Sequence, residues 1–280
     1  MLKYTVVDDL RLSSLGLGCS KFGSVRGASP AEVELVVRRA LDLGVTVFDT
    51  ASSYGQGDSE RMLGRLLRGR NDVSVMTKVG KLVPLSARVL RPVKPLMRMA
   101  VRRSSTADSL AVTARGDALP TSFDAGHLNR ALAGSLRRLG LSRPPVVMLH
   151  SVPTEVLVRG EAVSVLAKAA ERGDVGIVGV SVDTPDAADA ALRDSRVRIV
   201  QAPLFGSVDA FMSWCARAKA AGKVVVAREV LHGIGGVPGP ARAAFLRSAV
   251  QGVLRSGGAD VCLVGTSKQQ HLAEAVGAVV

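Results

Sequence analysis

The sequence of 280 residues predicts an α/β protein with the (β/α)8 TIM barrel fold. Short apolar or β-branched runs alternate with stretches of helical period along nearly the whole chain, and we count eight of each. Eight such units match the usual length of this barrel. The alternative, an open doubly wound sheet, requires a G-x-G-x-x-G loop after its first strand. Gly16 and Gly18 have the first spacing, but position 21 is Lys, so we predict one barrel domain over 1–280.

The first unit illustrates how each element is assigned. The predicted strand 15–19 is followed by Ser29, Pro30 and Glu32, a capping box with proline at the first helical position. An apolar stripe follows over 33–41, and Gly44 ends the helix. The further strands are predicted at 45–48, 73–77, 146–149, 176–180, 198–201, 223–227 and 261–264. Helices are predicted around 62–67, 128–139, 157–172, after 184, and at 211–221, 241–255 and 268–276.

The segment 79–123 interrupts the alternation, because it contains no clear strand. Between residues 81 and 117 it has eight Lys and Arg against two Asp, a surplus of six. It follows the third strand, on the face where barrel active sites lie. We therefore expect a long basic loop insertion that acts as a substrate lid or an anion-binding wall. The alternative is a mobile basic excursion with a helix near 95–103.

The composition restricts the classes of partner. With 37 Lys and Arg against 24 Asp and Glu, the net charge is +13, as in proteins that bind nucleic acid, anionic membranes or anionic ligands. Aromatic residues are few, no zinc-finger spacing occurs, and no apolar run reaches the roughly 18 residues of a membrane span. Three scattered cysteines are too few for a disulfide framework and favour a reducing compartment. The N-terminal stretch carries charges where a signal peptide needs apolar residues. The expectation is a cytoplasmic protein without a nucleic-acid, membrane or metal partner.

Polar residues stand where the second, third and fourth predicted strands end. These are Asp49, Lys78 and His150, and Tyr54 follows on the loop that leaves Asp49. Because the carboxyl ends of barrel strands open into one mouth, we expect the four side chains to meet there. A nearby ammonium lowers the pKa of a tyrosine and so prepares it as an acid and base. A carboxylate fixes the ammonium, and a histidine orients a carbonyl oxygen. Such a set suits carbonyl reduction, which requires a hydride-donating cofactor.

These motifs resemble those of the aldo-keto reductase family. FDTASSYGQGDSERMLG at 48–64, MTKVG at 76–80, MLHS at 148–151 and GDVGIVGVS at 173–181 occur in the family's order and spacing. The resemblance implies a (β/α)8 barrel that binds NADPH or NADH without a Rossmann fold and without a metal. It also implies Tyr54 as the general acid, Lys78 and Asp49 as the pair that tunes it, and His150 as the residue that orients the carbonyl.

The resemblance also implies a set of cofactor contacts. Ser181 and Gln201 match the contacts to the nicotinamide carboxamide, although Val182 replaces the family's usual Asn. Arg228 lies near the expected cofactor path. The stretch VCLVGTSKQQHLAEA at 261–275 resembles the family's adenosine-phosphate motif, with phosphate contacts from Gly265, Thr266, Ser267 and Lys268. His271 replaces an Arg of many NADPH-preferring members. Lys268 and the basic surface favour NADPH, with NADH as the alternative.

The expected function is NAD(P)(H)-dependent interconversion of a carbonyl and an alcohol, with Tyr54 as acid and base. The basic segment suggests a small carbonyl or sugar substrate with an acid or phosphate group. Two alternatives remain: an aldose or lactol dehydrogenase that runs mainly in the oxidative direction, and a cofactor-binding regulatory barrel with little turnover. The changed residue after Ser181 favours the second of these.

Overall fold

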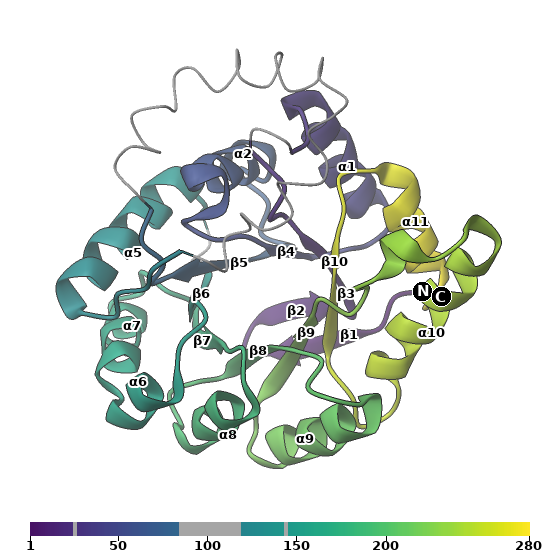
Figure 1. Ribbon diagram of the computed structural model, residues 1–280. Coiled ribbons are helices and arrows are strands. Elements are labelled where there is room, and N and C mark those ends of the chain that lie inside the picture. Colours follow the sequence, from purple (N-terminus) through teal and green to yellow (C-terminus); the bar gives the residue numbers. More distant parts are fainter. Residues whose placement is uncertain (25–26, 84–118, 143–144) are drawn as a thin grey trace.

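A closed barrel of eight parallel strands forms the centre of the molecule, with β10 next to β3 and β9. The computed structural model describes residues 1–24, 27–83, 119–142 and 145–280 (Figure 1). The (β/α)8 prediction is confirmed, because each of the eight predicted strands overlaps an observed one. The strands are β3 (Leu15–Gly18), β4 (Val47–Asp49), β5 (Ser74–Val79), β6 (Val146–Leu149), β7 (Ile177–Ser181), β8 (Ile199–Pro203), β9 (Val224–Arg228) and β10 (Val261–Gly265).

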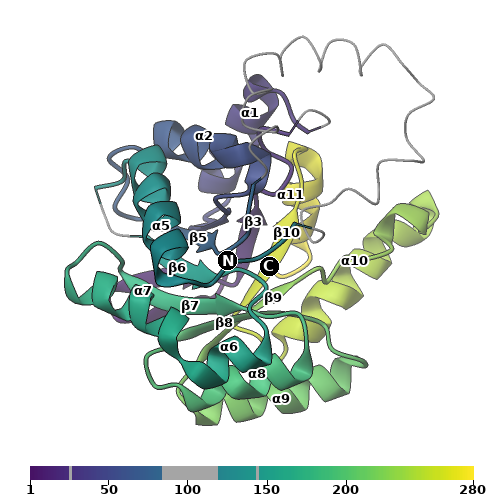
Figure 2. The same cartoon turned by 60° about the vertical axis from the view of Figure 1, so that its left-hand side comes forward.

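Helices surround the barrel on all sides (Figures 1 and 2). The capping box is confirmed at α1: the Ser29 hydroxyl accepts from the Glu32 amide, and the Glu32 carboxylate accepts from the Ser29 amide at 2.7 Å. The prediction of a single helix over 157–172 is wrong. Gly160 adopts the left-handed conformation, with φ 71°, and separates two helices there. The helices are α1 (Pro30–Asp42), α2 (Asp58–Leu66), α5 (Ala125–Leu139), α6 (Thr154–Arg159), α7 (Glu161–Glu171), α8 (Pro185–Arg193), α9 (Val208–Ala220), α10 (Gly239–Leu254) and α11 (Gln269–Gly277), with 3-10 turns η1 (Tyr54–Gly57) and η4 (Ile234–Gly236).

An N-terminal hairpin that the sequence did not predict closes one end of the barrel. Its antiparallel strands are β1 (Tyr4–Val7) and β2 (Leu10–Ser13). The buried Leu12 packs in one cluster with barrel residues such as Val47 and Val146, the first residues of β4 and β6. The hairpin therefore covers the amino-terminal ends of the strands, behind the barrel in Figure 1. The candidate residues lie at the opposite, carboxyl-terminal ends.

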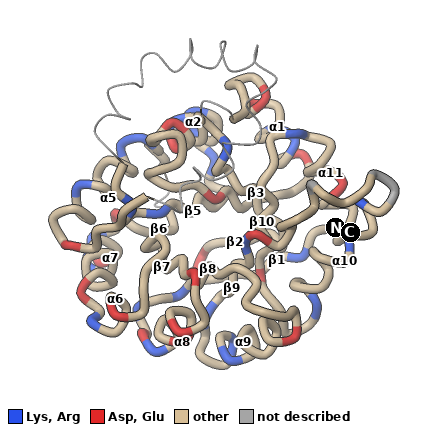
Figure 3. Tube along the Cα trace, in the orientation of Figure 1, with Lys and Arg blue, Asp and Glu red and all other residues tan. Residues whose placement is uncertain are grey.

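The interruption predicted at 79–123 is described only at its two ends. Lys81 and Thr121 form an isolated antiparallel bridge just beyond β5 and before α5. The rest of the basic segment, with the helix predicted near 95–103, lies outside the described residues. In the described parts, Lys and Arg alternate with Asp and Glu around the ring of helices (Figure 3). None of the described helices is both long and apolar enough to cross a membrane.

Candidate active site

Lys78 is the centre of a buried hydrogen-bond network at the carboxyl-terminal mouth. Its side chain is 1% exposed, and its Nζ donates to Asp49 Oδ2 at 2.7 Å, to the Thr50 carbonyl at 3.0 Å and to Tyr54 Oη at 3.4 Å. The strand register explains why the side chains of Lys78 and Asp49 meet. Asp49 of β4 pairs with Met76 of β5, and Lys78 lies two residues further along β5 on the same face. The structure thus brings Asp49, Lys78 and Tyr54 together as the sequence predicts.

The loop after β4 positions Tyr54 above Lys78. The Thr50 amide donates to the Met76 carbonyl at 2.7 Å, and the Ser52 amide donates to the Lys78 carbonyl at 3.0 Å. These bonds extend the β4–β5 pairing past the end of β4 before η1 begins at Tyr54. The Tyr54 ring then lies 5.0 Å from Lys78 Nζ, measured to its centroid. Backbone bonds therefore fix the approach of the phenol.

His150 completes the predicted group of four. It follows β6 directly, is buried, and its ring meets the Tyr54 ring edge-on with centroids 5.8 Å apart. Its Nδ1 has no hydrogen-bond partner within the described part of the chain. Burial and the charges of Lys78, Lys81 and Arg228 hold the pKa of His150 well below its ordinary value. The imidazole is therefore neutral at pH 7 and has one N–H to donate.

The pKa of Tyr54 moves in the direction opposite to the prediction. Burial raises it above the ordinary tyrosine value. The charge and hydrogen bond of Lys78 and the charge of Arg228 lower it, but together with the negative charge of Asp49 burial outweighs them. Burial alone disfavours the ammonium of Lys78, but Asp49 and Tyr54 outweigh it and raise the pKa of Lys78. The site thus pairs a charged ammonium with a protonated phenol. Such a phenol is a proton donor whose conjugate base the ammonium stabilises.

Gln201 and Ser181 extend the network from β8 and β7. Gln201 Nε2 donates to Asp49 Oδ1 at 2.8 Å, and Ser181 Oγ donates to Gln201 Oε1 at 3.0 Å. All three side chains are buried. A chain of hydrogen bonds therefore runs from Ser181 through Gln201, Asp49 and Lys78 to Tyr54. The two predicted carboxamide contacts are thus connected to the predicted acid.

The end of β10 has the features of a phosphate site. Gly265 is exposed and has open space where a Cβ would lie. The Thr266 hydroxyl accepts from the Lys268 amide at 3.1 Å and shapes the turn, and α11 begins at the next residue. A helix N-terminus beside a lysine attracts a phosphate. Together with the hydroxyl of Ser181 and the side-chain amide of Gln201, which are linked to Tyr54 through Asp49 and Lys78, the residues present fit a nicotinamide dinucleotide.

Arg228 is already engaged by neighbouring groups. Its Nη2 donates to the Val182 carbonyl at 3.0 Å, and its guanidinium forms ion pairs with Asp183 and Glu229. Two carboxylates thus balance the charge of a side chain that the family resemblance puts near the cofactor path. Val182, in place of the family's Asn, is fully buried. The structure therefore places an apolar side chain and an arginine ion-pair cluster beside Ser181.

Glu60 is a structural residue whose partners the sequence did not indicate. It is fully buried, and its carboxylate accepts from Thr77 Oγ1 and from Arg138 Nε, both at 2.6 Å. It thereby ties α2 to β5 and α5. Its place within the motif at 48–64 is the only feature of the sequence that points to it. Among the described residues, no three His, Cys, Asp or Glu side chains are grouped as they would be around a metal ion.

Known proteins resemble this chain in sequence and in fold. The model of the Aldo/keto reductase family matches residues 14–204. An uncharacterized oxidoreductase of Mycobacterium tuberculosis is 33% identical over 192 residues, 64% of this chain and 46% of that protein. A D-threo-aldose 1-dehydrogenase of a Pseudomonas species is 30% identical over 198 residues, 68% of this chain and 56% of that protein. The chain thus spans about half the length of these curated relatives.

Solved structures agree with the fold over almost the whole chain. An aldo-keto reductase of Bacillus halodurans in its holo form has a TM-score of 0.76 at 19% identity, covering 100% of this chain and 91% of that one. A protein of Pseudomonas aeruginosa assigned to the aldo-keto reductases has a TM-score of 0.74 at 25% identity, over 99% and 94% of the two chains. The family match includes β3 to β8 and the whole network around Lys78. The chain belongs to the Aldo/keto reductase family.

Proposed function

We propose that this protein is an NAD(P)(H)-dependent oxidoreductase that interconverts an aldehyde or ketone and the corresponding alcohol. The observation that supports this best is the position of Lys78 Nζ, 2.7 Å from Asp49 Oδ2 and 3.4 Å from Tyr54 Oη. An ammonium held between a carboxylate and a phenol prepares that phenol for proton transfer. Membership of the family supports the same reaction class.

The four residues divide the proton chemistry among them. A bound nicotinamide supplies or accepts the hydride, which no side chain can do. The neutral His150 holds the carbonyl oxygen of the substrate with its ring N–H. Tyr54 donates its proton to that oxygen as negative charge develops there, and Lys78 stabilises the resulting phenolate. In the oxidative direction, the Tyr54 phenolate removes the proton from the alcohol.

The function is tested by the Tyr54→Phe variant. We expect the native protein to oxidise NADPH in the presence of simple aldehydes, and Tyr54→Phe to lose nearly all turnover while it keeps NADPH affinity. The phenyl ring preserves the packing against His150, so a loss of turnover reports the missing hydroxyl. Turnover that remains unchanged in the variant would exclude Tyr54 as the acid.

The cofactor in this proposal is NADPH. Lys268 and the N-terminus of α11 offer positive charge for a phosphate, and Lys268 is exposed. Titration with NADPH and with NADH, followed through the fluorescence of Trp214, compares the two affinities directly. Lys268→Ala is expected to weaken NADPH binding and to leave NADH binding nearly unchanged. Equal losses for both cofactors would contradict the assigned phosphate contact.

A sugar dehydrogenase is the second candidate, and two relatives favour it. Besides the D-threo-aldose 1-dehydrogenase, an L-galactose dehydrogenase of Arabidopsis thaliana is 40% identical over 77 residues. Rates with aldoses and NADP⁺ should be compared with rates for aldehydes and NADPH. A faster oxidative reaction identifies the dehydrogenase. Tight cofactor binding without turnover on either panel would instead identify a regulatory barrel.

A further inference from the structure

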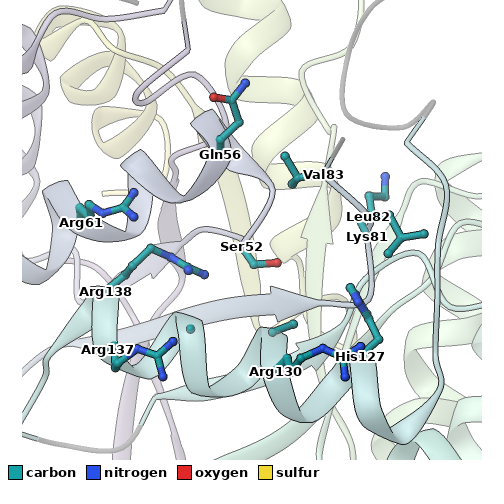
Figure 4. Close-up of a pocket in the computed structure, with 12 residues that line it drawn as sticks. Ser52, Gln56, Arg61, Lys81, Leu82, Val83, His127, Arg130, Arg137 and Arg138 are labelled. Carbon is teal, nitrogen blue, oxygen red and sulfur yellow. The ribbon is translucent and has the colours of Figure 1, made fainter. Parts of the chain in front are cut away.

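A pocket of about 580 Å³ lies beside the candidate active site, between α2, α5 and the chain that follows β5 (Figure 4). Ser52 and Gln56, on either side of Tyr54 in the chain, form part of its wall. The volume falls within the range of small-molecule sites. In both ribbon views α2 and α5 lie side by side (Figures 1 and 2).

The lining of this pocket is strongly cationic. It contains five Lys and Arg side chains and no Asp or Glu, the five being Arg61, Lys81, Arg130, Arg137 and Arg138. They come from three directions: α2, α5 and the chain after β5. A concave surface lined by one sign of charge concentrates its electrostatic potential and attracts counter-ions.

Two of the four arginines form an ion pair with a carboxylate outside the pocket, and the other two form none within the described residues. Arg61 pairs with Asp58 at 3.1 Å, and Arg138 pairs with Glu60 at 2.6 Å. Arg130 and Arg137 are exposed and form neither an ion pair nor a hydrogen bond within the described part of the chain. Asp124 acts on Arg130 electrostatically without forming an ion pair with it, so the face of the pocket formed by α5 keeps a net positive charge.

Arg138 is held in place before any ligand arrives. Glu60 accepts from its Nε, and its Nη2 donates to Ser135 Oγ at 3.2 Å. Two glycines leave room for it: a Cβ on Gly57 would lie 2.6 Å from Arg138 Nε, and one on Gly134 would lie 2.9 Å from Nη1. Figure 4 shows its side chain extending between α2 and α5 toward Ser52. A guanidinium fixed in this way loses little conformational freedom when it binds an anion.

The pocket and the candidate active site share two structural links. The loop that includes Ser52 and Gln56 also positions Tyr54. The buried Lys81, on the other side of the pocket, acts electrostatically on His150. A molecule that occupies the pocket thus contacts the loop that carries Tyr54 and the lysine whose charge acts on His150.

We propose that this pocket binds the phosphate group of a small phosphorylated molecule. A phosphate dianion offers acceptor oxygens in several directions, which matches guanidinium groups that converge from α2 and α5. The remaining volume has room for a short carbon skeleton. The binding of a phosphate group in this pocket does not depend on the proposed function. The role of the pocket as a subsite for a phosphorylated carbonyl substrate rests on that function.

Titration calorimetry of the cofactor-free protein with inorganic phosphate tests the site, at constant ionic strength and with chloride as the reference anion. The variant Arg130→Gln/Arg137→Gln removes the two arginines for which the described part of the chain provides no ion pair. Arg159→Gln/Arg193→Gln, on exposed positions of α6 and α8, removes the same charge elsewhere. We expect phosphate to bind about tenfold or more weakly to the first variant and normally to the second. No saturable binding, or equal losses in both variants, overturns the site.

Kinetics then identify the source of the phosphate. Glyceraldehyde 3-phosphate and glyceraldehyde are compared as substrates of the native protein and of both variants. A KM that rises about tenfold in Arg130→Gln/Arg137→Gln for the phosphorylated aldehyde alone shows that the phosphate belongs to the substrate. If phosphate binds saturably but the variant changes KM by the same factor for both aldehydes, the site binds a free phosphate compound and its role in substrate binding is excluded. Absence of all turnover contradicts the proposed function and leaves the calorimetric result for the site intact.

Discussion

Gln201 Nε2 donates a 2.8 Å hydrogen bond to Asp49 Oδ1, on the opposite side of that carboxylate from Lys78. Both oxygens of Asp49 are therefore occupied, Oδ2 by the ammonium and Oδ1 by the amide. Asp49 cannot rotate without breaking one of these bonds. Gln201 is also a proposed contact for the nicotinamide carboxamide, so it connects the cofactor position with the acid of the reaction.

Replacement of Gln201 by leucine tests this connection. Gln201→Leu leaves Asp49 Oδ1 buried without its donor, at a cost of about 1–3 kcal/mol in the free energy of unfolding. We expect a lower Tm and a kcat reduced by about tenfold, because Asp49 orients Lys78 less firmly. Ser181→Ala is the matched control, since it removes a hydrogen bond to Gln201 and keeps the one from Gln201 to Asp49. Equal effects of the two substitutions on kcat would show that Asp49 does not depend on Gln201.

The raised pKa of Tyr54 can be measured directly, because the chain contains only two tyrosines. In a Tyr4→Phe background, ultraviolet difference titration reports Tyr54 alone. We expect a midpoint above the ordinary value of about 10, and a still higher one in Lys78→Met, because Lys78 lowers the pKa of Tyr54. A midpoint below 10 in the native background would contradict the dominance of burial.

The substitution Lys78→Met is also expected to change the rate of the reaction. Lys78→Met removes the ammonium that stabilises the phenolate, so we expect kcat to fall by about 10²–10⁴-fold. Because the phenol of the native protein stays protonated through neutral pH, reduction is expected to remain active up to alkaline pH. The oxidative reaction, which needs the phenolate, is expected to accelerate as the pH rises toward the pKa of Tyr54. Parallel pH profiles in the two directions would rule out Tyr54 as the group that titrates.

The barrel and the meeting of Asp49, Lys78 and His150 could be predicted from the sequence, because both follow from local patterns. Strand ends are marked by the change from apolar to polar residues, and parallel strands bring those ends together. The hairpin at Tyr4–Ser13 was missed, since its short strands pack on the barrel interior without a turn signature that the sequence made plain.

The direction of the Tyr54 pKa could not be predicted, because it depends on a balance between burial and charge. The sequence identified Lys78 as a neighbour but not how deeply the phenol would be enclosed. The Arg138 partner of Glu60 and the Asp183 partner of Arg228 were missed for a similar reason. Arg138 is 78 residues from Glu60, and Asp183 is 45 residues from Arg228, so no local spacing connects them.

The ion pair between the fully buried Glu60 and the partly buried Arg138 predicts a large loss of stability when the arginine is removed. Arg138→Met leaves the fully buried carboxylate of Glu60 without its cation, and we expect the free energy of unfolding to fall by about 3 kcal/mol. Arg137→Met, at the exposed neighbouring position of α5, is expected to change it by less than about 0.5 kcal/mol. Urea unfolding of both variants provides the comparison. Similar midpoints would show that solvent reaches Glu60.

His150 predicts how stability depends on pH. Its pKa is lowered in the folded protein, so between the ordinary value of about 6.5 and that lower pKa the unfolded chain binds a proton that the folded chain does not. Its contribution to stability is therefore complete above pH 6.5 and is lost as the pH falls, at up to about 1.4 kcal/mol per pH unit. We expect His150→Gln to show a shallower decline in the free energy of unfolding between about pH 6.5 and 5 than the native protein. His232→Gln, at an exposed position, should keep the native slope, and urea unfolding at a series of pH values measures all three. If His150→Gln declines as steeply as the native protein, the imidazole of His150 is protonated as readily in the folded state as in the unfolded chain.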